Sequence, residues 1–133
     1  MTDKQLTDKT GAAVSVTFDG QRRAYALTLD TGEVAGRTFF TPASATEGPG
    51  GAEEWIFFHT EVDEALGGRG LGGILVGQAM ADVAERGVTV VPLCPFVKGW
   101  LEKNEESYAQ QGGKLRTPVH ADVDAARAAA QGE

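Results

Sequence analysis

The sequence has a single cysteine and no long apolar run, and each shortage excludes a class of protein. Cys94 alone cannot form an intrachain disulfide or a metal site built from several cysteines. No uninterrupted apolar stretch approaches about eighteen residues, the length that a transmembrane helix needs. The N-terminus also lacks the basic start and apolar middle of a signal peptide. We therefore expect a cytoplasmic protein.

Basic residues are also scarce. The sequence has twelve Lys and Arg residues and nineteen Asp and Glu residues, which gives a formal net charge of −7, and no basic cluster stands out. Nucleic acids and anionic membranes both require a local excess of basic side chains, so neither is expected as a partner. The same acidity favours a cationic substrate.

The length of 133 residues and the hydrophobic content of 41% suit one compact domain. We expect a loosely ordered lead-in over residues 1–12, a folded domain over 13–111 and a polar, alanine-rich tail over 112–133. Within the tail, residues 122–131 favour a marginal surface helix with too few large apolar groups to join the core.

Alternating apolar residues predict an antiparallel start to the sheet. The alternation runs over residues 14–18, and strand-like segments follow at 25–29 and 33–40, separated by glycine-containing turns. A loop with two prolines and three glycines at 41–52 then leads into an aromatic-rich strand at 53–62. The first three segments form an antiparallel meander.

The rest of the domain has the pattern of a βαβ unit. A glycine cluster at 67–73 follows the aromatic-rich strand, and an amphipathic helix at 70–86 leads to a β-branched strand at 88–93. Backbone N–H groups at the start of such a helix hold phosphate, and glycine lets the phosphate approach because no Cβ intervenes. The sequence thus predicts an α/β (α+β) domain with a mixed sheet and a phosphate site.

The glycine cluster fits three kinds of turn unequally. Gly68, Gly70 and Gly73 match the dinucleotide pattern G-x-G-x-x-G, but the next strand ends without the acidic residue that binds a ribose. A P-loop would require Gly-Lys followed by Ser or Thr, which is absent. A pyrophosphate cradle built from backbone N–H groups remains, with a glycine turn that binds no ligand as the alternative.

Three motifs together carry a family resemblance: His-Thr-Glu-Val at 59–62, the glycine turn, and Pro-Leu-Cys-Pro at 92–95 followed by Tyr108. Over about residues 22–110 the chain resembles the short, minimal members of the GNAT superfamily of acetyl-CoA-dependent N-acetyltransferases. The resemblance implies a GNAT-like sheet that splays between the strands at 53–62 and 88–93. The pantetheine arm of coenzyme A would lie in that gap.

The resemblance also implies which residues bind the cofactor, acetyl-CoA. The backbone of Glu61 and Val62 would pair with the pantetheine amides. The pyrophosphate would lie on the glycine turn, formed by Gly68, Arg69, Gly70, Leu71, Gly72 and Gly73. One residue departs from the superfamily pattern, because Gly67 stands where that turn usually begins with Gln or Arg. Arg69 is the candidate to replace the missing contact.

His59 and Cys94 are the catalytic residues that the resemblance implies. His59 would take the proton that an amine loses before it attacks the thioester. Cys94 could donate a proton to the departing thiolate, or could carry the acetyl group itself if a neighbouring His59 favours its thiolate. A buried inert thiol is the alternative. Tyr108 is either a further proton donor or a core residue.

The predicted function is transfer of an acetyl group from acetyl-CoA to a primary amine of a small molecule or peptide. One alternative is a non-catalytic acyl-CoA sensor or interaction module, in which His59 and Cys94 only pack. A weaker alternative is a flavin- or nicotinamide-binding domain.

Overall fold

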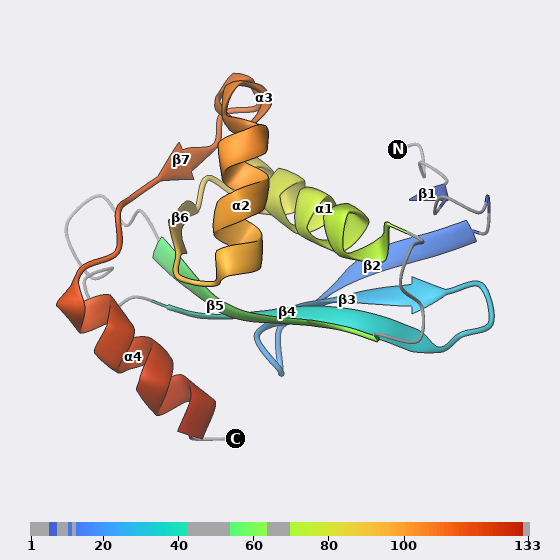
Figure 1. The fold of residues 1–133 in the computed structure, drawn as a ribbon, viewed down its shortest axis with the longest axis horizontal. Helices are drawn as coiled ribbons and strands as arrows, with labels where there is room; N and C mark the ends of the chain where they lie inside the picture. Colours follow the sequence, from blue (N-terminus) through green and yellow to red (C-terminus); the bar gives the residue numbers. More distant parts are fainter. Residues whose placement is uncertain (1–5, 8–10, 12, 43–53, 64–69, 132–133) are drawn as a thin grey trace.

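The computed structural model describes residues 6–7, 11, 13–42, 54–63 and 70–131. Within these residues the chain forms a seven-stranded mixed sheet in the order β1-β2-β3-β4-β5-β6-β7. Helices α1 and α2 cover one face of the sheet and α4 lies on the other (Figure 1). The strands are β1 (Leu6–Thr7), β2 (Ala13–Asp19), β3 (Ala24–Leu29), β4 (Val34–Pro42), β5 (Glu54–Val62), β6 (Thr89–Pro92) and β7 (Lys114–Leu115). The helices are α1 (Leu71–Glu85), α2 (Pro95–Lys103), α3 (Glu105–Gln110) and α4 (His120–Gln131).

The strand directions confirm the predicted fold class. Each neighbouring pair from β1 to β5 is antiparallel, as expected for a meander that continues into the fourth long strand. β5 and β6 are parallel and are connected through α1, which makes the expected βαβ unit. β7 adds a further parallel strand beside β6. Among the helices of the described residues, none is long and apolar enough to span a membrane.

The main core lies between α1 and the sheet. The apolar stripe of α1 is buried there as its periodicity predicts, with Leu71, Leu75, Ala79 and Val83 all inaccessible or nearly so. The phenol of Tyr25 on β3 donates a hydrogen bond of 2.6 Å to the carboxylate of Asp82 on α1 and so ties the helix to the sheet.

The C-terminal segment contributes more structure than its composition suggests. Ala126 of α4 is buried against Ile56 and Val91, in a second, smaller core on the opposite face of the sheet. The expectation of a helix excluded from the core was wrong at this position, because a small alanine side chain lets α4 approach the sheet closely. Arg116 then anchors the helix, with Nε 2.9 Å from Glu54 and a bidentate contact to Asp122 at 2.8 and 2.9 Å.

A β-bulge in β5 decides which side chains meet at its end. Phe39 of β4 lies opposite His59, whereas the next residue, Phe40, lies opposite Phe57, so Phe58 is an extra residue in β5. Side chains alternate between the two faces of a strand, and one extra residue reverses the alternation beyond it. Phe57 and Val62 accordingly both contact the main core, although they lie five positions apart and unbroken alternation would put them on opposite faces.

Candidate functional site

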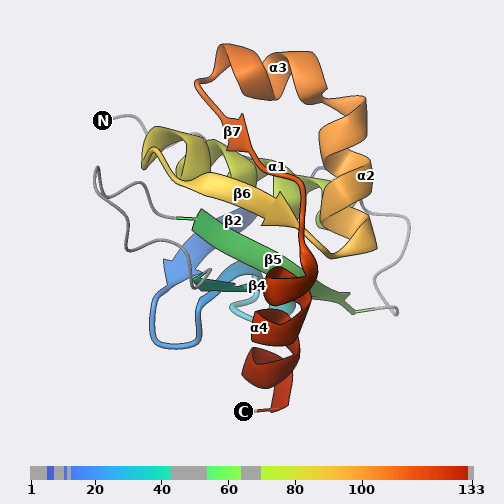
Figure 2. The same ribbon diagram turned by 90° about the vertical axis from the view of Figure 1, so that its left-hand side faces the viewer.

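β5 extends past the end of β6 and leaves a backbone edge without a strand partner. The last paired residues are Phe57 and Pro92, and the N–H groups of Leu93 and Cys94 then both donate to the carbonyl of Phe57, at 3.0 and 2.9 Å. Pro95 begins α2, which leads the chain away from the sheet (Figure 2). In the part of the chain that the structure describes, no strand pairs with the β6-side edge of β5 from 58 to 62. The gap expected beside this strand therefore begins where β6 ends.

Cys94 lies at this divergence, between the end of β6 and the start of α2. It is 5% exposed, and its Sγ donates to Oγ1 of Thr60 at 3.3 Å. Oγ1 of Thr60 is in turn 2.9 Å from Oγ1 of Thr38, its cross-strand partner on β4. A chain of three hydrogen-bonding groups, of which Thr38 and Cys94 are buried and Thr60 is half-buried, thus borders the gap on the α2 side of the sheet. Sequence reasoning missed both threonines, since only the strand register brings them together with the thiol.

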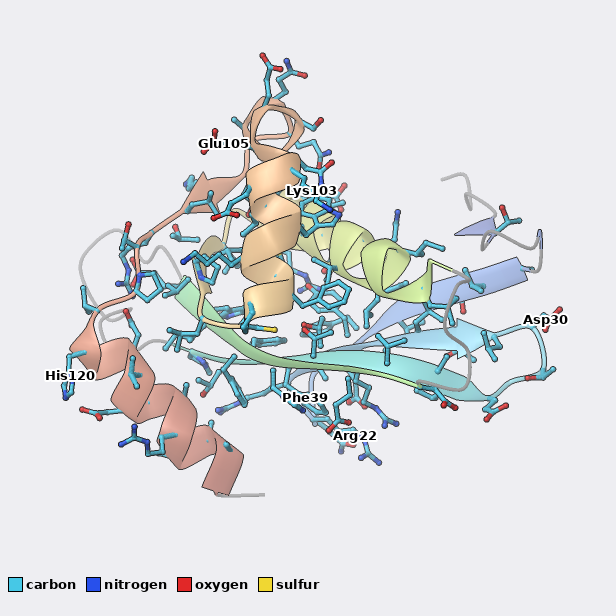
Figure 3. The ribbon with its side chains drawn as sticks, in the orientation of Figure 1. Arg22, Asp30, Phe39, Lys103, Glu105 and His120 are labelled. Atoms are coloured by element: carbon cyan, nitrogen blue, oxygen red, sulfur yellow. The ribbon has the colours of Figure 1, made fainter. Side chains whose placement is uncertain are left out.

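His59 lies on the opposite face. Its ring stacks on that of Phe39 with centroids 5.9 Å apart, and Nε2 is 3.0 Å from Oε2 of Glu61. Phe39 projects from the side of the sheet away from α2, as Figure 3 shows. The side chain of His59 is 52% exposed.

The structure therefore does not make His59 a neighbour of the Cys94 thiol, and that expectation was wrong. An unbroken alternation from Phe57 would place His59 on the same face as Cys94. The bulge at Phe58 moves His59 to the other face and brings Thr60 to the thiol instead.

The start of α1 offers uncapped backbone N–H groups close to the same gap. Gly70 adopts a left-handed φ of 74°, which favours glycine, and no side chain caps the helix or places an acidic group in its first turn. A Cβ on Gly72 would overlap the ring of Phe96 from α2, whereas Gly73 faces open space. Leu71 is buried. The other predicted residues of the turn, Gly67, Gly68 and Arg69, lie outside the described residues.

Tyr108 is a core residue remote from the thiol. It is almost completely buried, burial raises its pKa to about 12, and its hydroxyl donates to the carbonyl of Lys114 at 3.4 Å. Lys114 pairs with Thr89 at the start of β6, while Cys94 follows the end of that strand. Five positions along a strand span roughly 16 Å. The structure thus favours the packing role over the proton-donor role for Tyr108.

A cavity of about 720 Å³ lies on the α4 side of the sheet. Three phenylalanines from the strands and two alanines from α4 supply apolar surface, and the charged or titratable groups are Arg22, Arg23, His59 and Glu61. Arg22 and Phe39 lie on the same face in Figure 3. The sequence did not predict this cavity, because the C-terminal segment was expected to be a tail.

Comparison with known proteins assigns the chain to a family. Residues 24–111 match the family model described as GCN5-related N-acetyl-transferase. Among solved structures, the ribosomal-protein-alanine N-acetyltransferase from Brucella melitensis biovar Abortus 2308 is 24% identical, with a TM-score of 0.44 over 68% of this chain and 66% of that chain. No curated protein matches. Because the family model covers more than half of the sequence, from β3 through α3, this chain belongs to the GCN5-related N-acetyltransferase family.

Proposed function

We propose that this protein transfers the acetyl group of acetyl-CoA to a primary amine, with the pantetheine arm bound along the free edge of β5. The observation that carries the proposal is that edge, which is bordered by the contact between Cys94 and Thr60 at 3.3 Å. A free strand edge offers N–H and C=O groups in the pattern that an amide-containing chain can pair with. In this proposal Glu61 and Val62 bind the pantetheine amides.

The start of α1 supports a pyrophosphate site next to that edge. The N-terminal end of a helix carries partial positive charge and unpaired N–H groups, which attract phosphate. Gly70, Leu71, Gly72 and Gly73 form this end, and Gly73 has open space beside it. Arg69 and Gly68 complete the proposed binding turn.

Acetyl transfer forms a C–N bond between the amine and the carbonyl carbon and breaks the C–S bond of the thioester. The amine loses one proton and the departing thiolate gains one. Cys94 is suited to act on the sulfur side, because its thiol faces the gap at the N-terminal end of α2, where negative charge is stabilised. It either donates the proton to the thiolate or attacks first and carries the acetyl group.

His59 is suited to act on the amine side. The carboxylate of Glu61, 3.0 Å from Nε2, orients the imidazole as a carboxylate commonly does for a general base. Exposure of the ring lets the accepted proton pass to solvent. Donor and acceptor would then meet at β5 from opposite faces of the sheet.

Thiol release from acetyl-CoA in the presence of primary amines tests the proposal. Cys94→Ala should lower the rate by about 10²–10⁴-fold, the usual contribution of a proton-transfer group. Lys103→Ala, an exposed change on the same helix, is the matched control. A thermal shift with coenzyme A should persist in both variants, since ligand at one hundred times its Kd stabilises by about 2.7 kcal/mol.

Mass spectrometry after incubation with acetyl-CoA alone distinguishes the two roles of Cys94. An added acetyl group on the peptide that contains Cys94 identifies an acetyl carrier, and its absence with an active enzyme identifies a proton donor.

The separation of His59 from Cys94 also favours a second candidate function, an acyl-CoA sensor without catalysis. Binding of coenzyme A with no amine-dependent thiol release would support the sensor. An unchanged rate of thiol release in Cys94→Ala would overturn the catalytic role of Cys94 alone.

A further inference from the structure

The cavity on the α4 side of the sheet has the size and the mixture of surfaces of a small-molecule site. Its volume of about 720 Å³ lies within the range of roughly 300–1,000 Å³ that is common for ligand pockets. Aromatic rings from β4 and β5 form its apolar wall, and α4 contributes Ala129 and Ala130. Nothing in the proposed binding of acetyl-CoA uses this space.

One part of the cavity suits an amine. His59 and Glu61 project into it as a hydrogen-bonded pair, and a carboxylate attracts an ammonium group while the imidazole accepts its proton. Arg37, which lies opposite Glu61 on β4, does not line this cavity; it lines a neighbouring hollow to which Glu61 also contributes. Because β5 has no β6 partner from 58 onward, an amine here lies beside the proposed thioester gap.

Another part of the cavity suits an anion. Arg23 lies in the turn between β2 and β3 with a left-handed φ of 52°, and its Nη1 reaches Oγ1 of Thr41 at 3.4 Å. Among the described residues no carboxylate pairs with Arg23, whereas Arg22 is paired with Asp19 at 3.3 Å. The guanidinium of Arg23 is thus available to a ligand carboxylate.

The two parts are separated by a few strand positions. His59 lies opposite Phe39, and Thr41, the contact of Arg23, lies two residues further along β4. Two residues of an extended strand span about 7 Å. A ligand that reaches both parts therefore carries its amine and its anionic group several bonds apart.

We propose that the cavity binds the acetyl acceptor and that the acceptor is an ω-amino carboxylate. Its amine lies at His59 and Glu61, its carboxylate lies at Arg23, and its methylene chain packs on Phe39 and Phe58. This assignment rests on the proposed acetyltransferase function and deepens it by giving the chemical class of the acceptor.

Three acceptors of equal chain length test the proposal: δ-aminovalerate, pentylamine and cadaverine, which end in a carboxylate, a methyl group and a second amine. The wild-type protein should acetylate δ-aminovalerate with a kcat/KM roughly tenfold above that for pentylamine, as one charge-assisted contact provides. Arg23→Gln should abolish this ratio, mainly through KM. Arg127→Gln, which removes an exposed arginine of α4 that does not line the cavity, should retain it.

Equal kcat/KM values for the three acceptors, a preference for cadaverine, or an unchanged ratio in Arg23→Gln would overturn the proposal and leave acetyl transfer intact. Absence of both thiol release and a thermal shift with coenzyme A would instead refute the proposed function. In that case, calorimetric titration with δ-aminovalerate still tests whether the cavity binds an ω-amino carboxylate. Binding to the wild type that is lost in Arg23→Gln supports it, and no binding to the wild type refutes it.

Discussion

The two faces of β5 beyond its bulge differ in nearly every physical property. On the α2 side, two buried groups, Thr38 and Cys94, and the half-buried Thr60 form an uncharged set of hydrogen-bonding groups. On the α4 side, His59 and Glu61 are exposed and titratable. A thiol enclosed away from water and a base open to water suit different steps of one reaction. In the proposed mechanism the sheet separates the acetyl donor from the amine, and both reach the free edge of β5.

Among changes confined to one face, the largest effect on the rate is expected from replacing His59, the proposed general base. His59→Gln should lower kcat with an amine acceptor by about 10²–10⁴-fold, because the attacking amine then loses its proton acceptor. The thermal shift with coenzyme A should be unchanged, since His59 faces away from the α2 side. His120→Gln removes the other histidine, which is exposed on α4, and is the control. A loss of coenzyme A binding in His59→Gln would contradict the separation of the faces.

Release of α4 should disturb the acceptor side with a moderate cost in stability. Arg116→Met leaves the buried carboxylate of Asp122 without its bidentate partner, which should lower the free energy of unfolding by about 2–3 kcal/mol. Urea unfolding measures this change, with Arg127→Met on the exposed side of α4 as the control. The KM for the amine should rise because Ala129 and Ala130 line the cavity. An unchanged unfolding curve would show that the ion pair does not anchor the helix.

A smaller effect on stability is expected from removing the hydroxyl of Thr60, which accepts a hydrogen bond from the thiol of Cys94. Thr60→Val keeps the shape of the side chain and removes its contacts with Cys94 and Thr38, at a cost of about 1 kcal/mol in unfolding free energy. The variant should alter the alkylation rate of Cys94 without altering the KM for the amine. A change in the KM for the amine alone would place Thr60 on the acceptor side and contradict the assignment of the two faces of β5 to different substrates.

The smallest effect is a gradual dependence of stability on pH. The hydrogen bonds from Arg116 lower the pKa of Asp122, against the opposing effect of burial. A carboxyl group whose pKa is lower in the folded state stabilises the fold above its unfolded value, near 4, and loses that contribution as the pH falls through the folded value. Urea midpoints measured from pH 6 down to pH 2 should decline less steeply in Asp122→Asn than in the wild type. Parallel curves would contradict this assignment.

The strands and α1 were predictable because their patterns are local. Alternation over β2 and the buried stripe of α1 depend only on nearby residues, and the position of Cys94 after a β-branched strand placed it at the edge of the sheet. The bulge at Phe58 could not be predicted from the sequence. The run from Trp55 to Phe58 is apolar at every position, so no alternation is visible in it. The contact of Thr60 with Thr38 depends on that hidden register.

The cavity between α4 and the sheet could not be predicted from local sequence patterns either. Its walls come from the turn before β3, from two strands and from the far C-terminus. The helix that encloses it has mostly small side chains, which are a weak signal for packing. The ion pairs of Arg116 with Glu54 and Asp122, together with the burial of Ala126 against Ile56 and Val91, explain why the helix lies there.

Chemical modification with and without ligand tests the separation of donor and acceptor most directly. Cys94 is the only cysteine and His59 is one of two histidines, so alkylation and carbethoxylation can be followed at single sites by mass spectrometry. Saturating desulfo-coenzyme A, which lacks the thiol that would consume the alkylating reagent, should slow alkylation of Cys94 and leave modification of His59 unchanged, with His120 as the internal reference. δ-Aminovalerate should slow modification of His59 alone. Protection of His59 by desulfo-coenzyme A to the same degree as Cys94 would contradict the account.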